Sequence, residues 1–203
     1  MGKVRKIGIY GGSFNPIHKG HIALAKQILR QAQLDEVWFM VSPLNPFKVA
    51  DADLLDNHLR LQMAQKALEK EPGLYACDYE FHLPRPSYTW DTLQALHNDY
   101  PDDEFVLIIG ADNWLKFDHW YHSADLLGNY RIVVYARENS PVDTSSLPQN
   151  VMFIDTRLYR MSSTDIRQRI REGRPIKRLV PEAILDDVAV YKTMGPSKEA
   201  GKK

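Results

Sequence analysis

The sequence carries no excess charge of either sign. Its 26 Lys and Arg residues balance its 26 Asp and Glu residues, so the formal net charge at pH 7 is +0. A protein that binds nucleic acid over a broad surface would carry more positive charge, so we expect no nucleic-acid partner. Any site for an anion must therefore be built locally from a few residues.

Cysteine is nearly absent, and long hydrophobic runs are absent altogether. The single cysteine, Cys77, excludes an intramolecular disulfide and a cysteine-cluster metal site, and we interpret it as a packing residue. The apolar run near the N-terminus is too short for a signal peptide, and no stretch approaches the length of a membrane span. These absences favour a cytoplasmic protein without a membrane partner.

The sequence does contain a regular alternation of short apolar runs and helical patterns. The apolar runs predict strands at 6–10, 36–41, 74–79, 105–110, 130–136 and 150–155. The helical patterns predict helices at 21–32, 59–68, 89–100, 163–172 and 181–191. Such alternation is typical of βαβ units, so we expect an α/β fold with a doubly wound, mainly parallel sheet and helices on both faces. The 203 residues suffice for one domain, expected at 1–192, followed by a disordered tail at 193–203.

The first polar motif is "GGSFNPIHKGH" at residues 11–21, directly after the first predicted strand. Ligands of doubly wound sheets bind at the carboxyl ends of the strands, and Gly11 and Gly12 would let the backbone approach one closely. His18 and His21 would share one face of a helix that began near His18, with Lys19 between them. Positive side chains at a helix N-terminus are unfavourable unless an anion binds there, so these residues favour a polyphosphate site. A Gly/Pro turn with surface histidines stays an equally open alternative, and zinc is not favoured because no third ligand has suitable spacing.

The second polar motif is "YRMSSTDIRQRI" at residues 159–170. Ser162 or Ser163 would cap a helix, and Arg167 lies within about a turn of that cap, where a cation is disfavoured. An ordinary helix start would also contain such residues, and that alternative stays open. A second helix N-terminus with hydroxyls and a guanidinium would clamp phosphate, and two clamps facing one cleft would suit a nucleoside triphosphate.

Together these two motifs resemble the nucleotidylyltransferase superfamily. The pattern is Gly-x-Phe-x-Pro-x-His-x-Gly-His at 12–21 with Ser-Ser-Thr-x-Ile-Arg at 162–167. The rest of the chain resembles one family within it, the bacterial nicotinate-nucleotide adenylyltransferases, through "NPFK" (45–48), "PRPSYTWDTL" (84–93), "IIGADNW" (108–114) and "FDHWYH" (117–122). That family commonly has His where this chain has Phe47. Since Phe47 cannot donate to a phosphate, that role would fall to Lys48.

The resemblance implies the Rossmann-like form of the fold and a reaction. Adenylyl transfer from ATP to nicotinate mononucleotide would give nicotinate adenine dinucleotide and pyrophosphate, a step of NAD biosynthesis. Magnesium would enter with ATP, and no protein ligand for it is expected. The same chemistry on nicotinamide mononucleotide or phosphopantetheine stays an alternative, as does a non-catalytic nucleotide-binding regulator, which Phe47 favours. The oligomeric state stays open, a homo-oligomer included.

The resemblance also implies three sets of site residues. The expected catalytic residues are His18, His21, Lys48, Ser163 and Arg167. The expected ATP-binding residues are Gly11, Gly12, Ser13, Phe14, His18, His21, Gly110, Asp112, Ser162, Ser163 and Arg167. The expected residues for nicotinate mononucleotide are Lys48, Thr89, Asp112, Trp120 and Tyr121.

The acceptor end has a physical interpretation as well. Thr89 is a plausible N-cap, and the N–H groups of the helix that it would open would bind a carboxylate better than a neutral amide. In the family a Trp stacks on the pyridine ring, while the Thr and the following Tyr regions hold its carboxylate; the matching positions are Trp120, Thr89 and Tyr121. Asp112 follows a strand and would contact nucleotide hydroxyls. We interpret 42–55 as a candidate lid and 136–150 as a surface connection.

Overall fold

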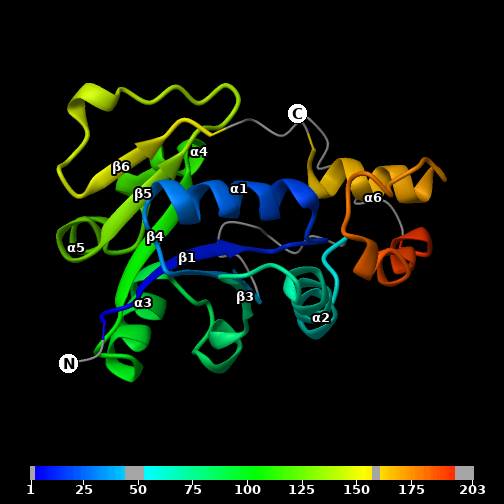
Figure 1. The fold of residues 1–203 in the computed structure, drawn as a ribbon, viewed down its shortest axis with the longest axis horizontal. Helices are drawn as coiled ribbons and strands as arrows, with labels where there is room; N and C mark the ends of the chain where they lie inside the picture. The colour runs from blue at the N-terminus through cyan, green and yellow to red at the C-terminus, as the bar shows by residue number, and fades with distance from the viewer. Residues whose placement is uncertain (1–2, 44–52, 157–160, 195–203) are drawn as a thin grey trace.

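A single parallel sheet organises the chain, of which the computed structural model describes residues 3–43, 53–156 and 161–194 (Figure 1). The strands are β1 (Lys6–Gly12), β2 (Glu36–Val41), β3 (Leu74–Cys77), β4 (Glu104–Gly110), β5 (Arg131–Tyr135) and β6 (Val151–Ile154). Their order in the sheet is β3-β2-β1-β4-β5-β6, and every neighbouring pair is parallel. This is the order of a doubly wound Rossmann-like sheet, as predicted.

The two faces of the sheet carry separate apolar clusters. In β4, Val106 and Ile108 belong to the cluster that includes side chains of α1 (Lys19–Gln31), α2 (Asn57–Leu68) and α6 (Ser163–Arg171). Leu107 and Ile109 belong to the cluster under α3 (Thr89–Asp99) and α5 (Ser123–Asn129). Because successive strand residues point to opposite faces, both faces are buried, and helices cover both as expected. We call these sides the α1 face and the α3 face.

Most predicted elements are confirmed with ends shifted by one or two residues, but two differ in kind. The predicted strand 74–79 stops at Cys77, and the chain continues as the 3₁₀ turn η1 (Tyr79–His82), because tertiary hydrogen bonds to Glu80 fix that turn. The predicted helix 181–191 is instead two 3₁₀ turns, η4 (Glu182–Ile184) and η5 (Asp187–Lys192). Short 3₁₀ turns bring Ile184, Val188 and Tyr191 all into the core.

The short helical elements between β4 and β5 were not predicted. They are α4 (Ala111–Trp114), η2 (Phe117–His119) and α5, and a further 3₁₀ turn, η3 (Thr144–Ser146), lies before β6. α4 and η2 are each four residues or shorter, so they carry no helical period that a sequence pattern could reveal. They matter because they extend from the carboxyl end of β4, where ligands of such sheets bind.

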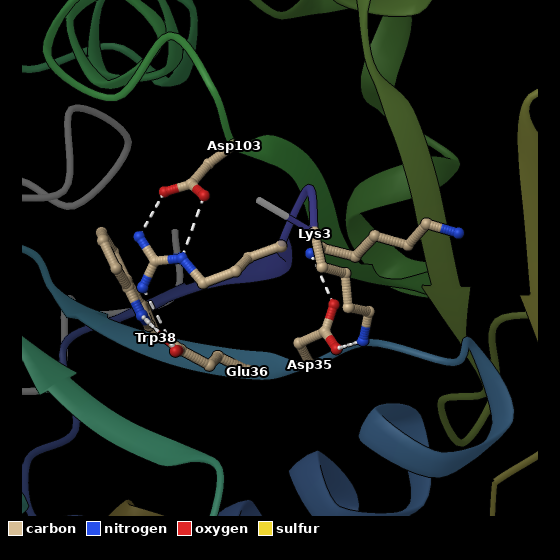
Figure 2. Close-up of polar contacts among 7 residues, drawn as sticks. Lys3, Asp35, Glu36, Trp38 and Asp103 are labelled. Atoms are coloured by element: carbon tan, nitrogen blue, oxygen red, sulfur yellow. Dashed lines mark hydrogen bonds and ion pairs between the residues drawn. The ribbon is translucent and has the colours of Figure 1, made fainter. Parts of the chain in front are cut away.

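The amino ends of three central strands are tied together by charged side chains (Figure 2). Asp35 accepts hydrogen bonds from Lys3 and from the backbone N–H of Lys6. Arg5 donates to Asp103 with an Nε–Oδ1 distance of 3.0 Å and lies 3.4 Å from Glu36. These pairs stand at the edge of the sheet opposite to the carboxyl ends. No helix among the described residues has the length and apolar character that crossing a bilayer requires.

Candidate active site at the carboxyl ends of the strands

A cavity of about 150 Å³ opens at the carboxyl ends of β1 and β4. In this strand order the connections from β1 and β4 leave toward opposite faces, which is the position where doubly wound sheets bind ligands. The strand ends supply one wall, and the start of α3 and the segment after η2 supply the other. The lining includes Tyr10, Gly11, Gly12, Ser42, Glu80, Ser87, Tyr88, Thr89, Thr92, Gly110, Asn113, Trp120, Tyr121 and Tyr135.

Two glycines near the strand ends leave space that a side chain would fill. A Cβ placed on Gly11 would meet no atom within 4 Å, so this residue borders free space in the cavity. A Cβ on Gly110 would lie 2.4 Å from Asp112 Oδ1 and 3.1 Å from Arg137. The side chains of Asp112 and Arg137 therefore cross directly over the end of β4, and only glycine admits them there.

His18 and His21 form a reciprocal cap at the start of α1. Nδ1 of His18 accepts the N–H of His21 at 3.3 Å, and Nδ1 of His21 accepts the N–H of His18 at 3.3 Å. The two rings stack with centroids 3.5 Å apart and an interplanar angle of 18°. The predicted common helix face is thus observed, and the pairing uses two of the free N–H groups that every helix start leaves.

The expectation of positively charged imidazoles at this helix start is wrong. Burial, and secondarily the charge of Arg137, lowers the pKa of His18 to about 4. Desolvation, followed by the neighbouring His18 and Arg137, holds the pKa of His21 well below its usual range. Each neutral ring accepts at Nδ1 and therefore carries its proton on Nε2, which remains a donor. The imidazoles at this helix start are therefore neutral caps and not unfavourable cations. The ammonium group of Lys19 donates to Lys177 O at 3.1 Å.

The second polar motif is packed against the first, and whether the two motifs clamp one triphosphate stays a prediction. Ser162 is the N-cap of α6, with its Oγ accepting the N–H of Asp165 at 3.1 Å. Ser163 Oγ donates to Pro16 O at 2.9 Å, and α6 lies beside the N-terminal end of α1 (Figure 1). Ser162, not Ser163, is therefore the cap, and Ser163 joins the two motifs.

Arg167 is buried between the motifs. It is 6% exposed, its Nη1 donates to Asn15 O at 2.8 Å, and its Nε lies 3.7 Å from Asp53 Oδ2. Asn15 Oδ1 also accepts from Tyr191 Oη at 2.6 Å and from Leu55 N at 3.2 Å. In this structure Arg167 thus holds α6 on the loop after β1. Neither it nor the imidazole pair is among the residues that line the cavity.

Arg137 lies next to Gly110 and Tyr135, two residues that line the cavity, although the sequence places it in a surface connection. It follows β5, its guanidinium carbon is 5.3 Å from the centre of the Tyr135 ring, and its Nε is 3.4 Å from Asp112 Oδ1. Its charge also acts on both histidines of α1. Arg137 is therefore the positive charge that acts on both the imidazole pair and the edge of the cavity. The rule that ligands bind at the carboxyl ends of strands would have found it, because it stands two residues after β5.

The acceptor side of the cavity is built from α3 and the segment after η2. Tyr88, not Thr89, is the N-cap of α3, and it makes no side-chain capping hydrogen bond. The expectation for Thr89 is thus wrong by one residue, because its backbone is already helical. Tyr88 and Tyr121 place their rings 4.7 Å apart, and Trp120 lines the cavity beside them. The structure brings together Thr89, Trp120 and Tyr121 as expected.

Other expected residues lie beside this cavity or outside the described chain. Ser13 and Phe14 follow β1, where Ser13 O accepts from the buried Arg60 and Phe14 packs into the core. Lys48, Phe47 and most of the candidate lid 42–55 lie outside the described residues, as does most of the expected tail. Among the described residues no group of three or more His, Cys, Asp or Glu side chains could hold a metal ion.

Known proteins share this fold and much of this sequence. The model of the Cytidylyltransferase-like family matches residues 9–169, so fold and site define a protein of that class. A probable nicotinate-nucleotide adenylyltransferase of Bacteroides fragilis (strain YCH46) is 49% identical over 179 residues, which cover 88% of this chain and 89% of the relative. A relative of the same description from Bacteroides thetaiotaomicron is 44% identical, with 92% of each chain covered. The chain belongs to the nicotinate-nucleotide adenylyltransferase family.

A solved structure shows the same fold at lower sequence similarity. The nicotinic acid mononucleotide adenylyltransferase of Plasmodium falciparum, complexed with NaAD, superposes with a TM-score of 0.77 at 20% identity. The match covers 94% of this chain and 97% of that one. It extends through the C-terminal region, beyond the part that the family model matches.

Proposed function

We propose that this chain transfers the adenylyl group of ATP to nicotinate mononucleotide. The products are nicotinate adenine dinucleotide and pyrophosphate, and the step belongs to NAD biosynthesis. The observation that carries the proposal is the cavity at the carboxyl ends of the strands, where the start of α3, which has no side-chain cap, and the rings of Tyr88, Trp120 and Tyr121 form one wall. Membership of the family supports it.

The reaction needs alignment more than a side-chain nucleophile. A phosphate oxygen of the acceptor attacks the α-phosphorus of ATP, a P–O bond forms, and the bond to the bridging oxygen of pyrophosphate breaks. Because the attacking oxygen is already anionic, the protein must hold two repelling phosphates together and stabilise charge on the leaving group. Magnesium enters as part of the substrate MgATP, with phosphates and water as its main ligands.

The phosphate end would use donors on three elements. The Nε2–H groups of His18 and His21 offer neutral hydrogen bonds, and Arg137 supplies the positive charge that the helix start lacks. The role of Lys48 as a donor to phosphate stays a prediction from its motif at 45–48. Ser163 and Arg167 position the loop after β1, and direct contact of either with phosphate stays a prediction.

The acceptor end would use the start of α3 and the aromatic wall. Free N–H groups at an uncapped helix N-terminus attract a carboxylate more strongly than an amide, which favours the acid form of the mononucleotide. Trp120 would stack on the pyridine ring. Gly11, Gly12, Gly110 and Asp112 would contact the nucleotides between the two ends. The cytoplasmic location and the oligomeric state stay predictions.

Product formation with a panel of acceptors tests the proposal. Purified chain is supplied with ATP, Mg²⁺ and, in turn, nicotinate mononucleotide, nicotinamide mononucleotide and phosphopantetheine, and pyrophosphate is measured. We expect the highest kcat/KM with nicotinate mononucleotide. Equal values for two acceptors would contradict the assigned acceptor, and tight ATP binding without pyrophosphate from any of them would identify a regulator.

A histidine variant tests the assigned chemistry. His21→Ala should fold and lose at least ~10²-fold in turnover, because a preorganised donor is removed from the phosphate site. His97→Ala, which removes an exposed imidazole from α3, is the matched control and should keep full turnover. Near-normal kcat in His21→Ala would exclude this residue from the mechanism.

A further inference from the structure

The wall of the cavity contains a buried carboxyl group that the proposed reaction does not use. Glu80 belongs to η1, is 8% exposed and lines the cavity together with Ser87 and Thr89. A carboxyl group in such a position is unusual for a pocket that is proposed to bind the carboxylate of its substrate, because two like charges in one enclosed site repel each other.

Hydroxyl groups from three segments converge on this carboxyl group. Ser42 Oγ, just after β2, lies 2.8 Å from Oε2, and Ser87 Oγ lies 3.4 Å from the same oxygen. Thr92 Oγ1, in the first turns of α3, lies 3.2 Å from Oε1. Thr92 Oγ1 also lies 3.1 Å from the carbonyl oxygen of Tyr88.

The number of protons decides which form of Glu80 this cluster suits. Four hydrogen-bond contacts are present, but three hydroxyl groups supply only three protons. With Glu80 ionised, Thr92 must choose between Glu80 and the Tyr88 carbonyl. With Glu80 protonated at Oε1, the carboxyl donates to Thr92 and Thr92 donates to Tyr88 O, so every contact is satisfied.

The position of Glu80 links its proton to the acceptor. Ser87 and Tyr88 directly precede α3 and Thr92 lies one turn inside it, so the carboxyl group lies against the helix start to which the acceptor carboxylate is assigned. A second carboxylate bound there would favour the neutral form of Glu80 further. Burial already raises the pKa of Glu80, while the hydroxyls of Ser42, Thr92 and Ser87 oppose that rise.

We propose that Glu80 takes up a proton when the acidic acceptor binds, so that the pocket holds only one carboxylate at a time and its affinity for that acceptor depends on pH. The inference rests on the proposed function. It predicts that the KM for nicotinate mononucleotide rises with pH as Glu80 ionises, whereas the KM for ATP does not follow that titration.

The other titratable groups around Glu80 are accounted for. Asp78 and His82 pair with each other at 3.6 Å on the surface, and burial raises the pKa of the Cys77 thiol to about 11. Arg60 of α2 is always charged and donates to Ser42 O at 3.0 Å. Four phenols line the cavity, those of Tyr10, Tyr88, Tyr121 and Tyr135, and the His58 ring of α2 packs 5.6 Å from that of Phe81, next to Glu80 in sequence. Asp78, the N-cap of η1, and His82 stand on the same short element as Glu80 but on the surface, so Asp78 offers the control.

Steady-state kinetics of Glu80→Gln across about pH 5.5 to 8.5 test the proposal, because glutamine has the shape of the neutral acid and does not titrate. At high pH we expect the KM for nicotinate mononucleotide to be about tenfold lower than in the wild type, as a coupling of one pKa unit requires. The wild-type value should approach that of the variant as the pH falls. The KM for ATP should be equal in both, and Asp78→Asn should follow the wild type throughout.

Calorimetry in two buffers of different ionisation enthalpy gives an independent measurement. Binding of nicotinate mononucleotide to the wild type should take up a proton that binding to Glu80→Gln does not take up. Because both proteins receive the same ligand, any proton change of the ligand phosphate is common to the two measurements. Should Glu80→Gln not fold, the wild type alone decides, since the acid mononucleotide must then take up more protons than the amide.

Two results would overturn the inference, and both differ from a failure of the proposed function. Parallel pH profiles of KM in an active wild type and in Glu80→Gln would show that Glu80 only supports the local structure. Equal proton uptake by the wild type and Glu80→Gln on binding nicotinate mononucleotide would also show that Glu80 only supports the local structure. A wild type that makes no pyrophosphate from nicotinate mononucleotide would instead refute the proposed function itself.

Discussion

His18 makes the stability of the α1 start depend on pH. Its pKa is about 4 in the folded chain and about 6.5 when unfolded, so between these values the unfolded chain binds more protons. The free energy of unfolding therefore falls as the pH drops through this window, by up to about 3 kcal/mol for this group. His18→Asn keeps a capping acceptor that does not titrate, so urea unfolding at a series of pH values should show a smaller fall. Parallel curves for the two proteins would contradict the buried neutral imidazole.

Trp120 offers a test of the acceptor end at a single residue. It lines the cavity, and its ring also packs 5.5 Å from that of Phe117. Trp120→Ala should weaken binding of nicotinate mononucleotide by about 1–3 kcal/mol, the usual range for stacking of a base on an aromatic side chain. Calorimetric titration with ATP is the internal control and should give an unchanged affinity. An equal loss for both ligands would assign Trp120 to packing alone.

Single residues of the site were predictable where a motif or a strand end pointed to them. Gly11, Gly12, Gly110, Thr89 and Trp120 line the cavity and stand in motifs that the sequence displays directly, whereas the role of both histidines stays a prediction. Glu80 was missed because its role depends on hydroxyls far along the chain, from Ser42 to Thr92, and no local pattern encodes such a convergence. The charge state of His18 was mispredicted for a related reason, since burial is a property of the fold.

At the scale of elements, one asparagine joins three segments that are far apart in sequence. Asn15, after β1, receives Arg167 from α6 and Tyr191 from η5. Tyr191→Phe removes a buried hydrogen bond of 2.6 Å and should lower the free energy of unfolding by about 1–2 kcal/mol. Turnover should change little, because Asn15 keeps its bonds to Asp53 and Leu55.

The matched control for that variant is on the outer strand of the sheet. Tyr75 of β3 is 51% exposed, and Tyr75→Phe should leave the free energy of unfolding within about 0.5 kcal/mol of the wild type. Urea denaturation of both variants gives the comparison. Equal losses would mean that the buried hydroxyl of Tyr191 adds nothing to the junction.

Elements with a clear period were predictable, and those fixed by tertiary contacts were not. β4 and α1 show strong apolar patterns, and both were placed to within two residues. α4 is too short to show a period. The region 181–191 has helical spacing of its buried residues but forms only 3₁₀ turns, and the tertiary contact of Tyr191 with Asn15 is one that no local pattern encodes.

At the scale of the whole molecule, both apolar clusters share one sheet, and we propose that residues 1–192 unfold as one domain. All four tryptophans pack against the cluster on the α3 face, so their fluorescence reports that face alone. Far-UV circular dichroism also reports α1, α2 and α6 on the other face. The two signals should give the same midpoint in urea. Loss of the circular dichroism signal at lower urea would show that the α1 face is a separate unit.

The first and last described residues lie in different places relative to the cavity. The charged pairs at Lys3 and Arg5 fix the first described residues at the edge remote from the cavity, while Tyr191 fixes the last turn beside the loop after β1. A sensor surface that tethers the protein through its leading residues would thus present the open pocket to the flowing solution.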